Sequence, residues 1–153
     1  MTAEEALGGA PLFKDFTETG LKIFAAISQV KAIPAGSPLF VENMVGESLF
    51  VVVSGTVRIT QRVGDGEKEL AVLGAGEHLG AVAILGKSVR LVSAVAATPC
   101  EVLEITQRDF ARLQPQKPQA CLKLALAIAA DLAAKVAENR DVLRDLPARK
   151  PAV

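Results

Sequence analysis

The chain has 153 residues and a mass of 16.0 kDa, a length that predicts a single domain. Hydrophobic residues make up 50% of it and charged residues 22%, so the composition favours a folded core and excludes a disordered chain. Seventeen basic residues balance seventeen acidic ones, and Trp and Tyr are absent. The sequence therefore predicts no nucleic-acid partner, because such a protein needs basic charge for phosphates and aromatic rings for bases.

The N-terminus and the apolar stretches predict a cytoplasmic protein that does not insert into a membrane. Residues 1–5 are acidic and lead into no apolar signal segment. The most apolar stretch, residues 124–130, is much shorter than the roughly 20 residues of a membrane span. Cys100 and Cys121 stand far apart without metal-ligand spacing, so we expect two buried, reduced thiols.

The first 29 residues have a helical pattern. We expect residues 1–10 to form a flexible N-terminus. After it, apolar residues recur at three- and four-residue spacing with an interruption at Gly20, which predicts two short helices. The apolar positions are Leu12, Phe13, Phe16, Leu21, Phe24, Ala25 and Ile27.

Residues 30–105 change to short segments of Val, Ile, Leu and Phe separated by glycines, which predicts an eight-stranded sandwich or roll. Residues 49–53 are apolar on both faces and should be covered on both. In residues 56–60 apolar and polar side chains alternate, which predicts that Thr60 points outward. An Asp-Gly pair at residues 65–66 predicts a hairpin.

Helical periodicity returns after residue 105. Thr106 is a helix cap for a short helix that ends at Leu113. Pro118 fits the first turn of a longer helix over about residues 117–146. Residues 147–153 follow as a tail.

The long helix carries a broad apolar stripe with two interpretations. Either the stripe packs on the β unit of its own chain, or it pairs with a second copy to form a homodimer. The stripe consists of Leu122, Ala125, Leu126, Ala129, Leu132, Ala133, Val136 and Leu143.

Three segments of the β region carry a specific order of glycine turns and strands: residues 33–42, 46–57 and 76–95. With the flanking helices they resemble the cyclic nucleotide-binding domain of catabolite-activator-type regulators, kinase regulatory subunits and gated channels. The resemblance implies a domain over residues 11–146. Its expected fold is mainly β with flanking α: a jelly-roll-like double-stranded β-helix, or β-roll, with N-terminal helices and a long C-terminal helix.

The third segment is where this family keeps its phosphate-binding cassette, a short helix and an arginine that hold the cyclic phosphate. The family's ribose-binding glutamate is replaced by alanine, and the residue after the arginine is a leucine, so the cassette is degenerate. Loss of that acceptor predicts affinity lower by about ten- to several hundred-fold. The resemblance assigns ligand binding to Gly80, Ala81, Val82, Ala83, Arg90 and Leu91.

Other interpretations of the arginine stay open at this point. Arg90 is either an anion-binding residue, a solvated loop residue or the partner of a carboxylate such as Glu77. An alignment that uses Glu77 as the ribose acceptor is not favoured, since it breaks the match at Gly80.

The sequence predicts no catalytic residues and no metal site. Its single histidine, His78, has no recognisable nucleophile nearby and cannot form a histidine-rich metal site of the cupin kind. We expect a stand-alone sensor or adaptor that signals to an unidentified partner protein through its C-terminal helix, with cAMP or cGMP as the candidate ligand. The alternative is a module that no longer binds cyclic nucleotide and serves as an interaction or dimerisation scaffold.

Overall fold

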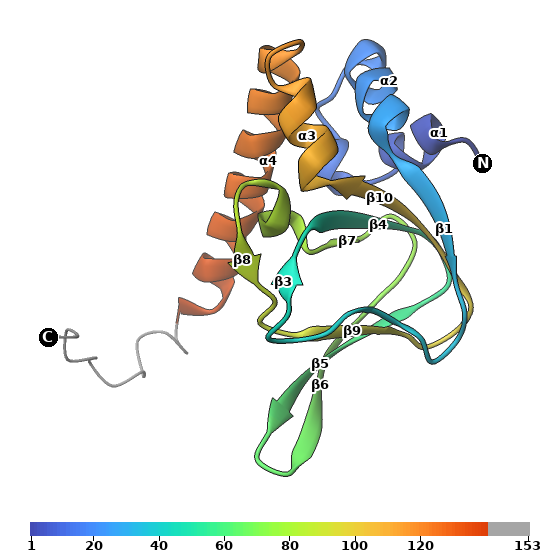
Figure 1. Ribbon diagram of the computed structural model, residues 1–153, viewed down its shortest axis with the longest axis vertical. Coiled ribbons are helices and arrows are strands. Elements are labelled where there is room, and N and C mark those ends of the chain that lie inside the picture. The colour runs from blue at the N-terminus through green and yellow to red at the C-terminus, as the bar shows by residue number, and fades with distance from the viewer. Residues whose placement is uncertain (141–153) are drawn as a thin grey trace, which may run out of the picture.

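The computed structural model shows a β-roll capped at one end by helices, and it describes residues 1–140 (Figure 1). Within these residues, four α-helices and two short 3₁₀ helices (η) surround or interrupt the strands. In chain order the helical elements are α1 (Ala3–Gly8), η1 (Pro11–Phe13), α2 (Glu18–Ile27), η2 (Ala81–Ile84), α3 (Gln107–Leu113) and α4 (Pro118–Glu138). The strands are β1 (Gln29–Ile33), β2 (Pro38–Phe40), β3 (Val45–Gly46), β4 (Ser48–Ser54), β5 (Val57–Val63), β6 (Gly66–Leu73), β7 (His78–Leu79), β8 (Ser88–Val89), β9 (Ser93–Ala96) and β10 (Cys100–Thr106).

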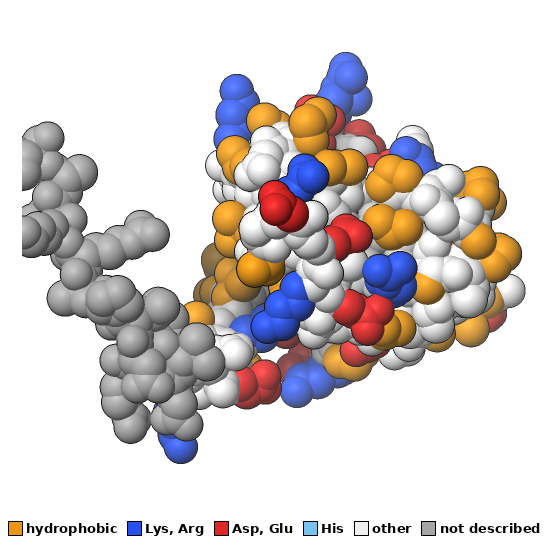
Figure 2. Space-filling view, turned by 90° about the horizontal axis from the view of Figure 1, so that it is seen from below, with side chains coloured by type: hydrophobic (Ala, Val, Ile, Leu, Met, Phe, Trp, Pro, Cys, Tyr) orange, Lys and Arg blue, Asp and Glu red, His pale blue; other side chains and the backbone are white. Residues whose placement is uncertain are grey.

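The strands pair antiparallel in two sheets and a ribbon. One sheet has the order β1-β10-β4-β7, the other has the order β2-β9-β5-β6, and β3 pairs with β8. The β5–β6 hairpin extends away from the helices at the opposite end of the roll (Figure 1). Seen from that end, charged side chains of both signs are interspersed with hydrophobic ones (Figure 2). The expected mainly β fold with flanking helices is confirmed.

Strand β4 separates two hydrophobic cores. Leu49 and Val51 face the helices, while Phe50 and Val52 face the interior of the roll, and all four are buried. Burial of each such side chain contributes about 1.5–3 kcal/mol, which explains why this strand is apolar on both faces. The helix-side core contains Leu7, Phe13, Phe24, Leu103, Ile105, Phe110, Leu124 and Ile128, among others. The roll core contains Phe50, Val52, Val57, Leu79, Ala94, Ala96, Cys100 and Val102.

The expectation of a flexible N-terminus over residues 1–10 is wrong. Residues 3–8 form α1, whose first turn is closed by a capping box between Thr2 and Glu5. Leu7 is fully buried in the helix-side core. The cap and the buried Leu7 stabilise this short helix. Six residues are too few to show the apolar periodicity that predicted the later helices.

The hairpin prediction is confirmed, while the orientation predicted for Thr60 is wrong. Val63 pairs with Gly66, so the loop has two residues, and Gly64 takes the positive φ of 60° that favours glycine. The register of the β5–β6 pairing shifts between Ile59 and Thr60, which breaks the alternation and leaves Thr60 only 1% exposed. Its hydroxyl donates to Glu67 Oε1 at 2.7 Å across the two strands. A hydrogen bond within the hairpin thus replaces water for this side chain.

The C-terminal helices follow the prediction in part. The Thr106 hydroxyl accepts from the backbone N–H of Asp109 and caps α3, and Pro118 occupies the first turn of α4. The expected continuation of this helix to residue 146 and the tail 147–153 lie outside the described residues.

The apolar stripe of α4 does not pack on its own chain. The helix buries Cys121, Leu124 and Ile128 instead, whereas Leu122 is 59% exposed and Leu126 is 61% exposed. Leu132 and Val136 are exposed as well, and Leu143 lies outside the described residues. The interpretation that placed the stripe against the β unit is therefore wrong for these side chains.

Candidate functional site

The predicted cassette, residues 76–95, runs from just before β7 into β9. Its short helix η2 packs against β4 and α3. Gly80 precedes η2 with a φ of 74°, a left-handed conformation that favours glycine over any residue with a Cβ. Ala81 and Ala83 are buried behind it, while Val82 is 41% exposed.

Backbone pairing brings Arg90 to the same place. It follows β8, which pairs with β3 through Gly46 and Ser88. Its own N–H donates to the carbonyl of Met44 at 2.8 Å, and its carbonyl accepts from the N–H of Asn43 at 2.8 Å. With the main chain fixed on both sides, the side chain turns inward and is only 8% exposed.

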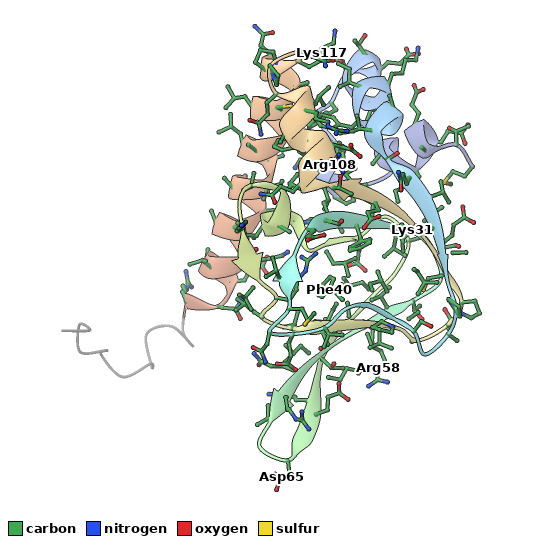
Figure 3. The ribbon with its side chains drawn as sticks, in the orientation of Figure 1. Lys31, Phe40, Arg58, Asp65, Arg108 and Lys117 are labelled. Atoms are coloured by element: carbon green, nitrogen blue, oxygen red, sulfur yellow. The ribbon has the colours of Figure 1, made fainter. Side chains whose placement is uncertain are left out.

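Two carbonyls and one aromatic ring surround the guanidinium. Nη2 donates to the carbonyl of Ser48 at 2.7 Å, and Nη1 donates to the carbonyl of Gly80 at 3.1 Å. Cζ lies 4.1 Å from the centre of the Phe40 ring, within cation–π distance. Phe40 lies in the interior of the roll, which places the charged group at the edge of the roll core (Figure 3). We call Phe40, Gly46, Ser48, Gly80 and Arg90 the arginine cradle.

Glycines make the space that the guanidinium fills. A Cβ at Gly46 would lie 2.7 Å from Arg90 Nε, and a Cβ at Gly80 would collide with Nη1 and lie 2.9 Å from the carbonyl oxygen of Ser48. Gly46 does not have a positive φ, so close approach and not turn geometry requires glycine there. Gly80 is thus required both by its positive φ and by the close approach of the guanidinium, and Gly46 by the close approach alone.

One donor of the arginine has no partner. Nε is buried and makes no hydrogen bond within the described part of the chain. A buried donor left unsatisfied costs about 1–3 kcal/mol, and more when the group is charged. The cradle therefore holds a buried N–H that an additional acceptor would satisfy.

The charge of the cradle is also unbalanced. Burial lowers the pKa of Arg90, yet a guanidinium stays protonated at neutral pH. No carboxylate of residues 1–140 forms an ion pair with it. Glu77, the expected alternative partner, accepts from the backbone N–H of Gly74 at 2.6 Å. The interpretations of Arg90 as a solvated residue or as the partner of Glu77 are therefore wrong, and a buried cation without a counter-charge favours an anion.

The two departures from the family pattern have different surroundings. Ala81 is 7% exposed and belongs to the helix-side core. Its methyl group has no hydrogen-bond acceptor. Leu91 is 80% exposed and lies outside the cradle. Of the predicted site residues, the structure brings Gly80 and Arg90 into direct contact and leaves Leu91 apart.

The sequence interpretation did not identify three members of the cradle. Phe40 and Gly46 lie in the two earlier glycine-rich segments, and Ser48 contributes only its backbone carbonyl. A glycine next to a short strand is the one local signal for Gly46. Nothing in the local sequence distinguishes the carbonyl of Ser48, because any residue there would supply one.

Described residues provide no support for two other kinds of site. No helix in residues 1–140 combines the length and apolar character needed to cross a membrane. The same part of the chain contains no cluster of three His, Cys, Asp or Glu side chains placed to hold a metal ion.

Comparisons with known proteins point to one family. The family model described as "Cyclic nucleotide-binding domain" matches residues 30–116. The chain is 32% identical over 122 residues to the "Cyclic AMP receptor protein" of Thermus thermophilus, covering 79% of this chain and 56% of the relative. It is 31% identical over 137 residues to "Glutaminase 2" of Bradyrhizobium diazoefficiens, covering 89% of this chain and 21% of the relative.

A solved structure agrees with the sequence comparisons. The Catabolite Activator Protein of Thermus thermophilus superposes with a TM-score of 0.78 at 31% identity, over 88% of this chain and 62% of that one. The likeness thus extends over both the roll and the helices that flank it.

Proposed function

The chain belongs to the cyclic nucleotide-binding domain family, and from that premise we propose that it is a sensor domain that binds a cyclic nucleotide through the arginine cradle. The observation that carries the proposal is the buried guanidinium of Arg90, which has an unpaired Nε and no neighbouring carboxylate. A phosphate oxygen would satisfy that donor and balance the charge. A charge-assisted hydrogen bond of this kind is worth about 1.5–3 kcal/mol.

The sugar of the nucleotide is expected to be bound more weakly than in a cassette with a glutamate. Ala81 cannot accept a hydrogen bond from a ribose hydroxyl, and the carboxylate of Glu77 is already paired with Gly74. A missing charged hydrogen bond of about 1.5–3 kcal/mol corresponds to a loss of roughly ten- to several hundred-fold in affinity. The proposed ligand class is therefore cAMP or cGMP, held mainly by its phosphate.

Signal output is assigned to α4. Its exposed apolar side chains Leu122, Leu126 and Val136 form a face that its own chain leaves uncovered. A second copy of the chain is the proposed partner for this face, because small alanines between the larger side chains allow two helices to approach closely. A further protein partner would receive the signal through the same helix.

The proposal assigns no reaction and no partner name to the chain. The chain spans 56% of one relative and 21% of the other, so their remaining segments and activities are not carried over. His78, the single histidine, is engaged with Asp131 and does not face the cradle residues.

A second candidate function is a scaffold that has kept the fold without the ligand. It is favoured by Ala81 and by the two carbonyls, of Ser48 and Gly80, that already occupy two donors of the guanidinium. In this case α4 would serve association alone. The scaffold and the sensor share the fold and differ in whether Nε receives an acceptor.

Thermal unfolding with and without nucleotide separates the two functions. A ligand that binds only the folded state raises the melting temperature, so cAMP or cGMP should stabilise the wild-type chain and not Arg90→Ala. No stabilisation by either nucleotide at millimolar concentration would favour the scaffold. Sedimentation of wild type beside Leu126→Glu, with the exposed Lys123→Glu as a charge control, tests the helix face independently: only the Leu126 variant should dissociate a dimer.

A further inference from the structure

A side-chain pair ties α4 to the roll. His78 Nε2 of β7 lies 3.0 Å from Asp131 Oδ2 of α4, and the two side chains are 12% and 28% exposed. The residues are 53 positions apart in the sequence. Among the side-chain hydrogen bonds of residues 1–140, it is the one that joins this helix to a strand of the roll.

Asp131 stands where the helix leaves the body of the protein. The buried contacts of α4 end with Ile128, Asp131 is the last half-buried side chain, and residues 132–140 are all exposed. In Figure 1 the lower part of α4 runs down the side of the roll on which β8 is drawn. Without Asp131, the segment that carries Leu132 and Val136 would have no side-chain hydrogen bond to the roll within residues 1–140.

The other end of the connection is the arginine cradle. His78 pairs with Val51 of β4 and lies two residues before Gly80, whose carbonyl accepts from Arg90 Nη1. A phosphate that accepts from Arg90 Nε would bind the same guanidinium whose Nη1 donates to the carbonyl of Gly80. Leu79 alone separates Gly80 from His78, so a shift of Gly80 would reach the ring that contacts Asp131 through a short stretch of backbone.

The charged groups around the pair keep Asp131 ionised. Lys135, one turn further along α4, lies 2.9 Å from the same oxygen, Oδ2. Burial would raise the pKa of Asp131, but hydrogen bonds from Lys135 and His78 outweigh it and hold the pKa below its ordinary value. Lys14, Asp15 and Lys123 line the same hollow between η1 and α4, which has a volume of about 510 Å³.

From this geometry we infer that the His78–Asp131 pair is a latch that couples the arginine cradle to the exposed end of α4. The latch sets the position of residues 132–138 relative to the roll, and anion binding at Arg90 changes that position through Gly80 and His78. The inference rests on the proposed function for its input signal, while the latch itself rests on the contacts of the ligand-free chain. A ligand can shift α4 only if some contact of the helix differs between the ligand-free and the ligand-bound chain. The His78–Asp131 pair is the contact to which we assign that difference.

Hydrogen–deuterium exchange of the full chain tests the latch without any ligand. Asp131→Ala should accelerate amide exchange in residues 129–138 several-fold, since that segment then loses its contact with the roll. Lys135→Ala is the matched control, because it removes the neighbouring intrahelical pair and leaves the bond to His78. His78→Ala should act like Asp131→Ala, and His78→Gln should restore protection, since its amide still donates to Asp131. Equal exchange in wild type and Asp131→Ala would overturn the latch.

A second arm adds cAMP at saturating concentration and follows the same peptides. We expect the nucleotide to change exchange in residues 129–138 of wild type and of Lys135→Ala, and to leave Asp131→Ala and His78→Ala unchanged. A nucleotide effect that persists in Asp131→Ala would overturn the coupling. Absence of nucleotide binding to wild type would reject the proposed function, and the ligand-free arm would still decide whether the latch exists.

Discussion

The arginine cradle and Ala81, which follows Gly80 in the chain, differ in what builds them. The cradle is built from two glycines, two backbone carbonyls and an aromatic ring around one buried charge. Ribose recognition in this family depends on a single side chain, and here that side chain is a methyl group in the helix-side core. The backbone carbonyls and glycines that position Arg90 come with the fold, whereas the charge of Arg90 and the ribose acceptor each depend on one side chain.

Removal of the Arg90 charge should have the largest effect on nucleotide affinity. Arg90→Ala deletes both the Nε donor proposed to meet the phosphate and the positive charge beside it, so nucleotide affinity should fall by about a hundredfold or more. Arg90→Lys is the matched variant: it keeps the charge and loses the planar group that contacts both carbonyls, so its affinity should fall between those of wild type and Arg90→Ala. Titration calorimetry measures both. Unchanged affinity in Arg90→Ala would place the ligand elsewhere.

A ribose acceptor introduced at residue 81 should raise nucleotide affinity. Ala81→Glu should raise affinity for cAMP or cGMP by about ten- to several hundred-fold, because the carboxylate can accept from the ribose. The same variant should melt at a lower temperature without ligand, since a carboxylate is introduced at a position that is only 7% exposed. Ala81→Leu adds bulk without an acceptor and should not improve binding. If affinity fails to rise in a folded Ala81→Glu variant, ribose recognition does not depend on residue 81.

Glycine substitutions test whether the cradle needs space as well as backbone freedom. Gly80→Ala and Gly64→Ala both force alanine into a left-handed conformation, which costs about 1–2 kcal/mol. A Cβ at Gly64 meets nothing within 4 Å, whereas a Cβ at Gly80 meets Arg90 and the carbonyl of Ser48. Gly80→Ala should therefore lower the free energy of unfolding by about 1–3 kcal/mol more than Gly64→Ala, and it should weaken anion binding. If urea unfolding shows that both variants lose the same free energy of unfolding, the cradle accommodates a Cβ at Gly80 without cost.

The smallest expected effect concerns the latch and pH. The pKa of Asp131 is lower in the folded chain than its ordinary value of 3.8. Its ionised form therefore stabilises the fold above that value, and the contribution disappears as the pH falls through the lowered pKa. The stability difference between wild type and Asp131→Asn should be about 0.2–1 kcal/mol at neutral pH and should shrink in acid. Urea unfolding at several pH values measures it, and a difference that grows in acid would contradict the sign.

Local patterns were sufficient to predict most of the fold. The apolar run of β4, the hairpin and the Thr106 cap all follow from properties of a few neighbouring residues. The burial of Leu7 and of Thr60 did not follow, because each depends on a partner that the local pattern does not reveal. The face that α4 buries was also missed, since Cys121, Leu124 and Ile128 form a second stripe beside the more conspicuous leucines and alanines.

The site was predictable where it coincides with the family pattern. Gly80 and Arg90 were identified by resemblance, and the structure brings them together. Phe40, Gly46 and the pair of His78 with Asp131 arise from contacts between distant segments, so periodicity and spacing could not reveal them. Close approach of a glycine to a buried charge is a property of the folded chain alone.

Isothermal titration of the purified full chain with cAMP, beside Arg90→Ala under the same conditions, tests directly whether the cradle binds an anion. We expect saturable, Arg90-dependent binding that is weaker than in a cassette with a ribose-binding glutamate. Silence of the wild-type chain at millimolar cAMP and cGMP, or equal binding by both proteins, would contradict the proposed role of the cradle and favour the scaffold.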